Sequence, residues 1–312
     1  MRTVRPFAVM SNLLAAALVV LHAGGVFATT FTTIDNPLGA LGTSATGISG
    51  SNIVGFYVDT WPNRHGFLYN GSTYTTLDDP LGRTTEPFGI SGNVVVGRYS
   101  DSSGTQHGFL YNGSTYTTLN DPLAGSGSAG TTATGVSGAN VVGYYYDVNN
   151  YGPYGFLYNG STYTTLSDPL GGGTQINGIS GNNIFGFYMD SLEKVHGFVY
   201  DGSSYKTIDD PLAGGETVVT GISGSNIVGY YFDPSWNIHG FIYNGSTYTT
   251  FDSPLGTTTE LLGISGNNVV GYYSGVGDPH SFVATIVPEP SSYALLGIGA
   301  ICLVGLTWRS RR

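Results

Sequence analysis

At residues 65–82 the chain reads HGFLYNGSTYTTLDDPLG, and this stretch decides the fold because it recurs along the sequence. Near copies begin at His107, Tyr154, His196 and His239. A second phrase, GISG or GVSG followed by Asn and an apolar run, begins at Gly47, Gly89, Gly135, Gly178, Gly221 and Gly263. The steps between these glycines are 42, 46, 43, 43 and 42 residues, so one unit is written six times. Periods of this length are typical of propellers, solenoids and other repeat arrays.

Each unit contains four short pieces rich in Val, Ile, Tyr, Phe and Thr, which read as strands because turn residues separate them. In the first full unit they are residues 45–48, 52–57, 66–69 and 73–77. Asn70-Gly71 between the last two pieces favours a type I′ hairpin turn. Pro80 ends the fourth piece, since proline cannot donate to a ladder. Each unit is therefore predicted to be a four-stranded antiparallel meander.

The two ends of the array indicate how the meanders assemble. Residues 30–39 copy the fourth piece with no third piece before it, and residues 280–284 copy the third piece with no fourth after it. A closed ring explains this phase because the first strand completes the last sheet and removes the unpaired edges. We therefore expect an all-β fold, a six-bladed β-propeller over residues 29–286 closed by the N-terminal strand. The glycines and serine of GISG are expected on the innermost strand. An open β-solenoid, which normally needs polar caps, is the alternative.

Both ends of the chain are predicted to be targeting segments. Residues 1–28 read as a signal peptide that forms a helix, with Arg2 and Arg5 before an apolar run; an uncleaved anchor is the alternative. Residues 287–312 hold an apolar run, 293–308, followed by three arginines. At about 1.5 Å per residue this run spans about 24 Å as a helix, so a transmembrane helix with a basic cytoplasmic tail is predicted. An ordinary tail anchor is the other interpretation.

Two resemblances follow from these motifs. Val287, Pro288, Glu289 and Pro290, with the apolar run and the basic tail, resemble the PEP-CTERM sorting signal of Gram-negative bacteria. That resemblance implies an exosortase-type partner, a transient inner-membrane anchor, and delivery to the cell surface or the extracellular space. The repeats of residues 29–286 resemble HAF-type extracellular repeats, with His-Gly-Phe-Leu-Tyr in place of His-Ala-Phe-Leu-Trp. That family is described by location, so it implies no particular activity.

Composition excludes several function classes. The chain has 10 Lys and Arg against 20 Asp and Glu, giving a formal net charge of -10. Nucleic acid binding is not expected, because Lys and Arg contacts to phosphate supply most of that affinity. Docking on an anionic bilayer through a basic patch is disfavoured for the same reason. The single cysteine, Cys302, excludes a disulfide within one chain.

The recurring histidines are the first candidates for chemistry. They are His65, His107, His196, His239 and His280. Catalytic and metal sites need several groups that converge, whereas one histidine per blade leaves them far apart. We predict a structural role, a hydrogen bond to the Asp that recurs late in the second strand. Those aspartates are Asp59, Asp101, Asp147, Asp190 and Asp233.

The Asp-Asp pairs before proline, as at Asp78 and Asp79, are predicted to form Asx turns. Binding of Ca²⁺ is the minority interpretation, because no D-x-D-x-D-G loop is present. We expect no metal and no cofactor.

Binding is expected on the loops that differ most among the units, because recognition is commonly placed on variable loops of a rigid scaffold. The candidate ligand-binding residues are Trp61, Arg64, Tyr151 and Trp236, which could stack on sugar rings. We therefore predict an exported, non-catalytic binding or structural module, with extracellular polysaccharide as a candidate partner. The alternative is a propeller lyase or hydrolase acting on polysaccharide. It would need acid, base or metal groups at the axis, where GISG is expected to bring only small neutral residues.

Overall fold

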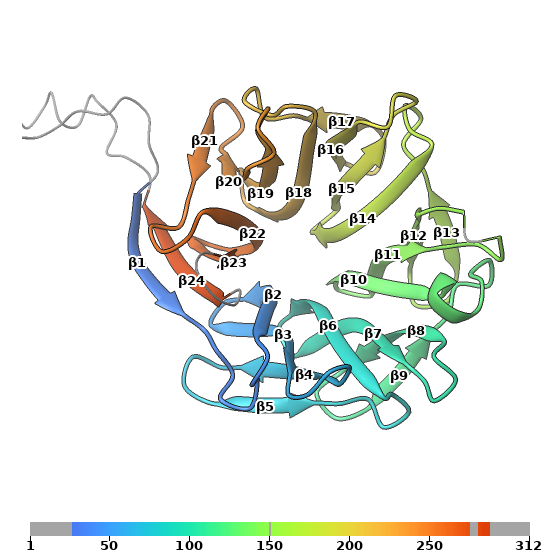
Figure 1. Cartoon of the computed structure of the whole chain (residues 1–312). Coiled ribbons are helices and arrows are strands. Elements are labelled where there is room, and N and C mark those ends of the chain that lie inside the picture. The colour runs from blue at the N-terminus through green and yellow to red at the C-terminus, as the bar shows by residue number, and fades with distance from the viewer. Residues whose placement is uncertain (1–26, 150, 275–279, 288–312) are drawn as a thin grey trace, which may run out of the picture.

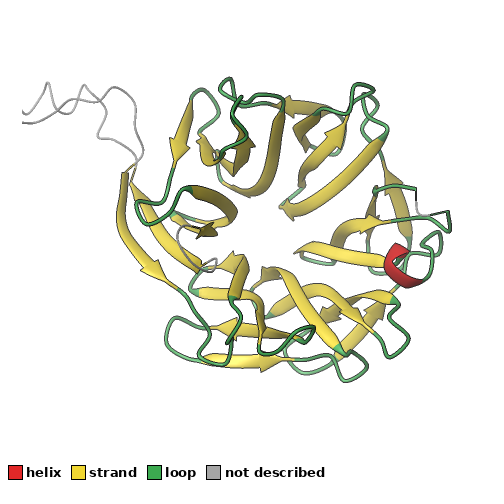
Figure 2. Ribbon diagram, viewed as in Figure 1, coloured by secondary structure: helices red, strands yellow, loops and turns green. Residues whose placement is uncertain are grey.

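The computed structural model describes residues 27–149, 151–274 and 280–287, and these residues form a disc of strands around a central channel (Figure 1). Strands make up nearly all of the regular structure, and the 3-10 turn Gly127–Ala129 is the sole helical element of the described chain (Figure 2). The all-β prediction is therefore confirmed.

The strands form six blades of four strands, each a meander that starts near the axis and ends at the rim, and a single parallel bridge between Val195 and Glu216 joins the fourth and fifth blades. The first two blades contain β2 (Thr43–Ser49), β3 (Asn52–Val58), β4 (Arg64–Tyr69), β5 (Tyr74–Leu77), β6 (Thr84–Ser91), β7 (Val94–Ser100), β8 (Gln106–Tyr111) and β9 (Tyr116–Leu119). The third and fourth contain β10 (Thr131–Ser137), β11 (Asn140–Tyr145), β12 (Tyr154–Tyr158), β13 (Tyr163–Leu166), β14 (Gly173–Ser180), β15 (Asn183–Met189), β16 (Val195–Tyr200) and β17 (Tyr205–Ile208). The last two contain β18 (Glu216–Ser223), β19 (Asn226–Phe232), β20 (Ile238–Tyr243), β21 (Tyr248–Phe251), β22 (Thr258–Ser265), β23 (Asn268–Ser274), β24 (His280–Val287) and β1 (Phe27–Thr33).

The sixth blade is completed by the N-terminal strand. Its order is β22, β23, β24, β1, and β1 pairs antiparallel with β24 from Phe27 opposite Val287 to Thr33 opposite Phe282. The rings of Phe31 and Phe282 stack with their centroids 4.4 Å apart. Six blades and closure by the N-terminal strand, as predicted from the phase of the repeats, are both confirmed.

The innermost strands carry the GISG phrase and crowd the axis. A Cβ built on Gly135 would lie 2.7 Å from the Cα of Gly178 in the next blade, and one on Gly89 would lie 3.0 Å from the Cα of Gly135. Such approaches are closer than packed side chains allow, so these positions require glycine. The expected place of GISG is confirmed.

Neighbouring blades pack through apolar side chains that interdigitate. The third strand of every blade buries one phenylalanine completely. These residues are Phe67, Phe109, Phe156, Phe198, Phe241 and Phe282, each 0% exposed. Because each blade has an apolar surface on both sides, burial against two neighbours is the main driving force for closing the ring.

The turn between the third and fourth strands differs from the prediction. Tyr69 pairs with Tyr74, which leaves a four-residue loop, and within it only Gly71 has a positive φ, of 95°. The side chain of Asn70 accepts hydrogen bonds from the amides of Ser72 and Thr73 at 3.0 and 2.9 Å. The type I′ prediction is wrong, because the asparagine caps the loop with its side chain instead of adopting positive φ.

The meander gives the disc two different faces. Turns between first and second strands and between third and fourth strands share one face, the turn face. The loops between second and third strands and the links to the next blade share the other, the loop face. Since β1 replaces a fourth strand and β24 is a third strand, the start of β1 and the end of β24 lie side by side at the turn face (Figure 1).

The predicted signal helix and C-terminal transmembrane helix fall almost wholly outside the described residues. Within residues 27–149, 151–274 and 280–287, no helix has the length and apolar character needed to cross a membrane.

Candidate ligand-binding face

The channel opens on the loop face through an aromatic cavity, which we call the mouth. It has a volume of about 270 Å³. The second strands contribute Phe56, Tyr144, Phe187 and Tyr230, and the first strands contribute polar side chains that include Gln175 and Asn177. Each aromatic ring of this set stands opposite a residue of the inner strand, as Phe56 does opposite Ser44. The mouth therefore combines large apolar faces with hydrogen-bonding groups.

A bulge in the innermost strand aims further polar groups at the axis. The pairing with the second strand shifts between Ala45 and Gly47, so Thr46 is left without a partner in the ladder. The same shift recurs in every blade. Bulges of this kind redirect a side chain, and the bulged residues Thr46, Thr134, Asn177 and Thr220 line the mouth.

Hydrogen bonds between blades hold these bulged side chains in place. Thr134 donates to the carbonyl of Ile176 at 2.8 Å and Asn177 donates to that of Val219 at 2.9 Å. Thr220 donates to the carbonyl of Leu261 at 2.7 Å. Each bond joins one blade to the next, so the polar wall of the mouth is preorganised.

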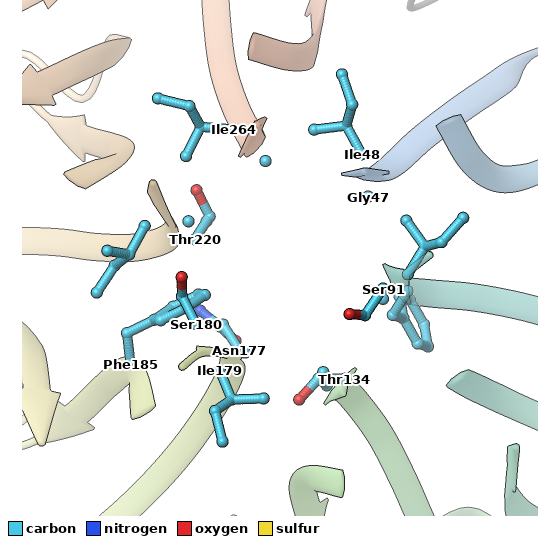
Figure 3. Close-up of a pocket in the computed structure, with 18 of the residues that line it drawn as sticks. Gly47, Ile48, Ser91, Thr134, Asn177, Ile179, Ser180, Phe185, Thr220 and Ile264 are labelled. Atoms are coloured by element: carbon cyan, nitrogen blue, oxygen red, sulfur yellow. The ribbon is translucent and has the colours of Figure 1, made fainter. Parts of the chain in front are cut away.

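Toward the turn face the channel continues as a second cavity of about 250 Å³. Glycines, isoleucines and the serines of GISG line it, and Thr134, Asn177 and Thr220 stand around its open centre (Figure 3). Phe185 occupies the position where Val54 stands in the first blade, and its ring lies under Gly178. This end of the channel is lined by neutral groups.

The loop-face end also carries charge, which the sequence did not indicate. Glu86 accepts hydrogen bonds from Arg64 at 2.9 Å and from Arg98 at 2.8 Å, one on each carboxylate oxygen. Arg64 lies over the rings of Phe56 and Trp61, at 5.5 and 5.7 Å from their centroids. Arg64 belongs to the first blade and Glu86 and Arg98 to the second, so the Arg64–Glu86 ion pair also joins the two blades.

A second carboxylate, Glu260, lies three residues before the GISG phrase of the sixth blade. Burial raises its pKa, and a hydrogen bond from Tyr272 opposes the rise. The GISG residues themselves bring only neutral groups to the channel. Glu86 and Glu260 precede that phrase on the same inner strands, nearer the loop face, and were not among the predicted site residues.

The predicted loop aromatics lie where variable loops leave the disc. Trp61, Tyr151 and Trp236 are 73%, 67% and 70% exposed. Trp236 also borders a smaller cavity of about 200 Å³ between the fourth and fifth blades. Arg64 does not project freely with them. It begins β4, is held by Glu86, and leaves 30% of its side chain exposed.

The histidines lie on separate blades, and His65, His107, His196 and His239 each stand between two polar partners. The Nδ1 atom of His65 lies 2.8 Å from Asp78, and its Nε2 atom lies 3.5 Å from Asp59. Corresponding Nδ1 contacts of 3.0, 2.8, 2.9 and 3.1 Å are made by His107, His196, His239 and His280. The contact to the second-strand Asp is present, but the closer partner at the end of the fourth strand was missed. A constant spacing of 13 residues was the signal for it.

The second residue of each Asp-Asp pair forms the predicted Asx turn. The Oδ1 atom of Asp79 accepts the amide of Leu81 at 2.9 Å. Within the described residues no group of three or more His, Cys, Asp or Glu side chains is arranged to hold a metal ion.

A hydrogen bond between blades at the same turn was missed. The backbone amide of Asp79 donates to the hydroxyl of Thr85 in the next blade at 2.9 Å. Its counterparts are Thr43, Thr131, Thr174, Thr217 and Thr259, four residues before each GISG glycine. That fixed position in the repeat was the available signal.

Comparison with known proteins adds a sorting motif and a fold. Residues 287–312 match the PEP-CTERM protein-sorting motif, which indicates a protein exported and processed by an exosortase in Gram-negative bacteria. No curated protein sequence matches the chain. A triple arginine-to-alanine mutant of AofleA from Arthrobotrys oligospora is similar in structure, with a TM-score of 0.53 and 14% identity over 83% of this chain and 90% of that chain. A mutant of Aleuria aurantia lectin, in complex with α-methyl-L-fucoside, has a TM-score of 0.50 and 13% identity over 83% of this chain and 99% of that chain. At this identity the likeness concerns the fold.

Proposed function

We propose that this chain is an exported, non-catalytic carbohydrate-binding propeller that takes its ligand at the mouth of the loop face. The supporting observation is the mouth itself, where Phe56, Tyr144, Phe187 and Tyr230 surround the amide of Gln175. Aromatic rings offer apolar faces to the C–H surfaces of a pyranose, while amides and hydroxyls hydrogen-bond its hydroxyl groups. The sugar bound by the similar Aleuria aurantia lectin favours the same class of ligand.

The place of the sorting signal supports a role at the cell surface. β24 ends at Val287 on the turn face, and residues 288–292 precede the apolar run. Five residues reach at most about 18 Å. A domain tethered by that run would turn its loop face away from the membrane, toward extracellular polysaccharide. The exosortase-type partner, the transient anchor and the kinship with HAF-type repeats belong to this proposal.

Binding of polysaccharides to the full-length protein in detergent tests the proposal. A panel of neutral and acidic polysaccharides is titrated against the wild type and against Tyr144→Ala and Phe187→Ala variants. Removing one stacking ring is expected to weaken binding about tenfold, since such contacts contribute about 1.5 kcal/mol. Leu192→Ala is the matched control, because Leu192 lies on the same face and is 75% exposed. Absence of binding to the whole panel, or equal binding by all variants, contradicts the proposal.

The alternative, an enzyme that cleaves polysaccharide, would be placed at Glu260. A carboxyl group whose pKa is raised by burial, with Tyr272 as its hydrogen-bond partner, is a pair suited to proton transfer. Incubation with the same panel and measurement of polymer length tests this function. Shortening that disappears in a Glu260→Gln variant would favour the enzyme over the binding module.

A further inference from the structure

Basic side chains are concentrated in one sector of the loop face. The described residues contain five Lys and Arg side chains: Arg64, Arg83, Arg98, Lys194 and Lys206. Arg64 begins β4 and Arg98 lies on β7, while the exposed Arg83 lies on the link between them. Three of the five therefore belong to the first two blades, although the chain as a whole is acidic.

Two of these arginines share one carboxylate and so leave a positive charge unbalanced. Glu86 pairs with both Arg64 and Arg98 through separate oxygens. A guanidinium has five N–H donors, and the ion pair to Glu86 uses only one nitrogen of each arginine. The arginine side chains remain 30% and 23% exposed, whereas that of Glu86 is only 7% exposed. The unused donors are therefore accessible from the loop face.

Aromatic rings fix the orientation of both guanidinium groups. Arg64 lies over Phe56 and Trp61, and Arg98 lies 5.4 Å from the ring centroid of Phe88. Phe56 and Phe88 line the mouth. Arg98 stands at the second-strand position that holds an aromatic residue in each of the other five blades. Because it lies over Phe88, which lines the mouth, its cation is placed beside the mouth.

Two further glutamates of the loop face lie on other blades. Glu260 is on β22 and Glu216 is on β18, in the sixth and fifth blades. The arginine sector also holds Asp59 and Asp101, whose side chains are 41% and 31% exposed and contact His65 and His107 on the third strands. Around Phe56 and Phe88 of the mouth, the first two blades therefore carry two arginines against the single buried carboxylate of Glu86.

We infer that the carbohydrate bound at the mouth is acidic, a polysaccharide whose carboxylate groups are held by the guanidinium groups of Arg64 and Arg98. The inference rests on the proposed carbohydrate-binding function and names the class of its ligand. Arginine donors pair with a carboxylate in a planar, charge-assisted arrangement, and Phe56 and Trp61 provide ring faces beside them for the sugar.

Three polymers test the inference on the full-length protein in detergent: a polyuronate, the same polymer with its carboxyl groups reduced to alcohols, and a sulfated neutral polysaccharide. The polyuronate is expected to bind at least about tenfold more tightly than its reduced form, since a charge-assisted hydrogen bond contributes about 1.5 kcal/mol or more. Arg64→Gln and Arg98→Gln should each remove about tenfold of polyuronate affinity and leave the reduced polymer unaffected. The Glu86→Gln variant should bind the polyuronate more tightly. Added salt should weaken polyuronate binding.

Controls separate this inference from the proposed function and from loss of folding. Lys206→Gln removes an exposed cation from an outer strand and should change no affinity. Arg83 lies outside the Glu86 cluster, so the Arg83→Gln variant can be used if Arg64→Gln fails to fold. It should weaken polyuronate binding about twofold. Equal binding of polyuronate and reduced polymer overturns the inference while the proposed function stands. Tighter binding of the sulfated polymer overturns the carboxylate assignment, and binding of none of the polymers overturns the proposed function itself.

Discussion

The hydroxyl of Ser281 in the last blade donates a hydrogen bond of 2.7 Å to the backbone carbonyl of Thr43 in the first. The same hydroxyl accepts the amide of Ala45 at 2.8 Å. At the equivalent position the other five blades have glycine, as at Gly66, where a Cβ would lie 2.3 Å from the carbonyl of Leu77. The seam between the last and first blades therefore has a side-chain link that the other junctions lack.

Replacing Ser281 with glycine tests whether this link stabilises the ring. Ser281→Gly restores the residue of the other blades but leaves the buried amide of Ala45 without the hydroxyl. The free energy of unfolding should fall by about 2 kcal/mol, measured by urea denaturation. Ser51→Gly, at an exposed turn position, should leave the midpoint unchanged. Equal midpoints for both variants would show that backbone pairing of β1 with β24 is sufficient.

The ring could be predicted from the sequence because its cause is repetitive. Each unit contains the same strands. Because no third piece precedes Phe31 and no fourth piece follows Phe282, the two ends are expected to pair with each other. The hydrogen bonds that Ser281 makes to the first blade could not be predicted in the same way. Ser281 is a single departure from the glycine of the repeat, and its role can be recognised only when the structure shows which groups of the two blades it joins.

The threonine that precedes each GISG phrase supplies a second test of how blades are joined. Thr131 is buried and accepts the amide of Asp121, in the preceding blade, at 2.8 Å. Thr131→Val keeps the shape but leaves that buried N–H unsatisfied, which should cost about 2 kcal/mol. Thr117→Val, at an exposed strand position, is the matched control. Hydrogen exchange should accelerate at Asp121 in the first variant only, and unchanged protection would contradict the assignment.

The binding face was harder to predict than the fold. The loop positions of Trp61, Tyr151 and Trp236 followed from comparing one unit with another. The mouth depends instead on bulged residues such as Thr46, whose side chains point to the axis only because the pairing shifts there. A bulge cannot be recognised from the alternation of apolar and polar residues along a strand. The polar groups of the mouth and the nearby Glu86 were therefore not predicted.

Asp79 allows a prediction about pH. Burial raises its pKa above the ordinary value, and its Oδ2 atom has no hydrogen-bond partner. The folded state thus holds the proton more tightly than the unfolded state. The stabilisation is complete below the unfolded pKa, near 3.9, and is lost as the pH rises through the raised folded pKa.

Asp79→Asn should therefore increase stability at neutral pH, by about 1 kcal/mol, and have little effect at pH values below the unfolded pKa. Asn36 already forms the same turn in the sixth blade, where its Oδ1 atom accepts the amide of Leu38 at 2.9 Å. Thermal melting of both proteins across the acid range checks the difference. Asp101→Asn is the opposite case, because hydrogen bonds from Ser103 lower the pKa of Asp101 to about 2. That variant should lose stability at neutral pH, and a loss in Asp79→Asn as well would contradict the assignment.

The glycines at the axis set how closely the blades approach, and at Gly135 the three atoms nearest to an added Cβ all belong to the backbone of the next blade. A Cβ at this position would lie 2.7 Å from the Cα of Gly178 and 2.8 Å from the amide nitrogen of Ile179. Backbone atoms of a closed ring cannot move aside locally, so Gly135→Ala must push the third and fourth blades apart. Overpacking of this kind typically costs about 1–3 kcal/mol.

Gly172→Ala is the matched control, because a Cβ there meets nothing within 4 Å. We expect it to match the wild type in urea denaturation, while Gly135→Ala unfolds at a lower urea concentration. The geometry of the mouth should also change, because Thr134, next to Gly135, donates a hydrogen bond to the carbonyl of Ile176 across the same junction. A Gly135→Ala variant that keeps full stability would mean that the blades can separate at no cost, and the mouth would then not be the rigid site that the proposed function requires.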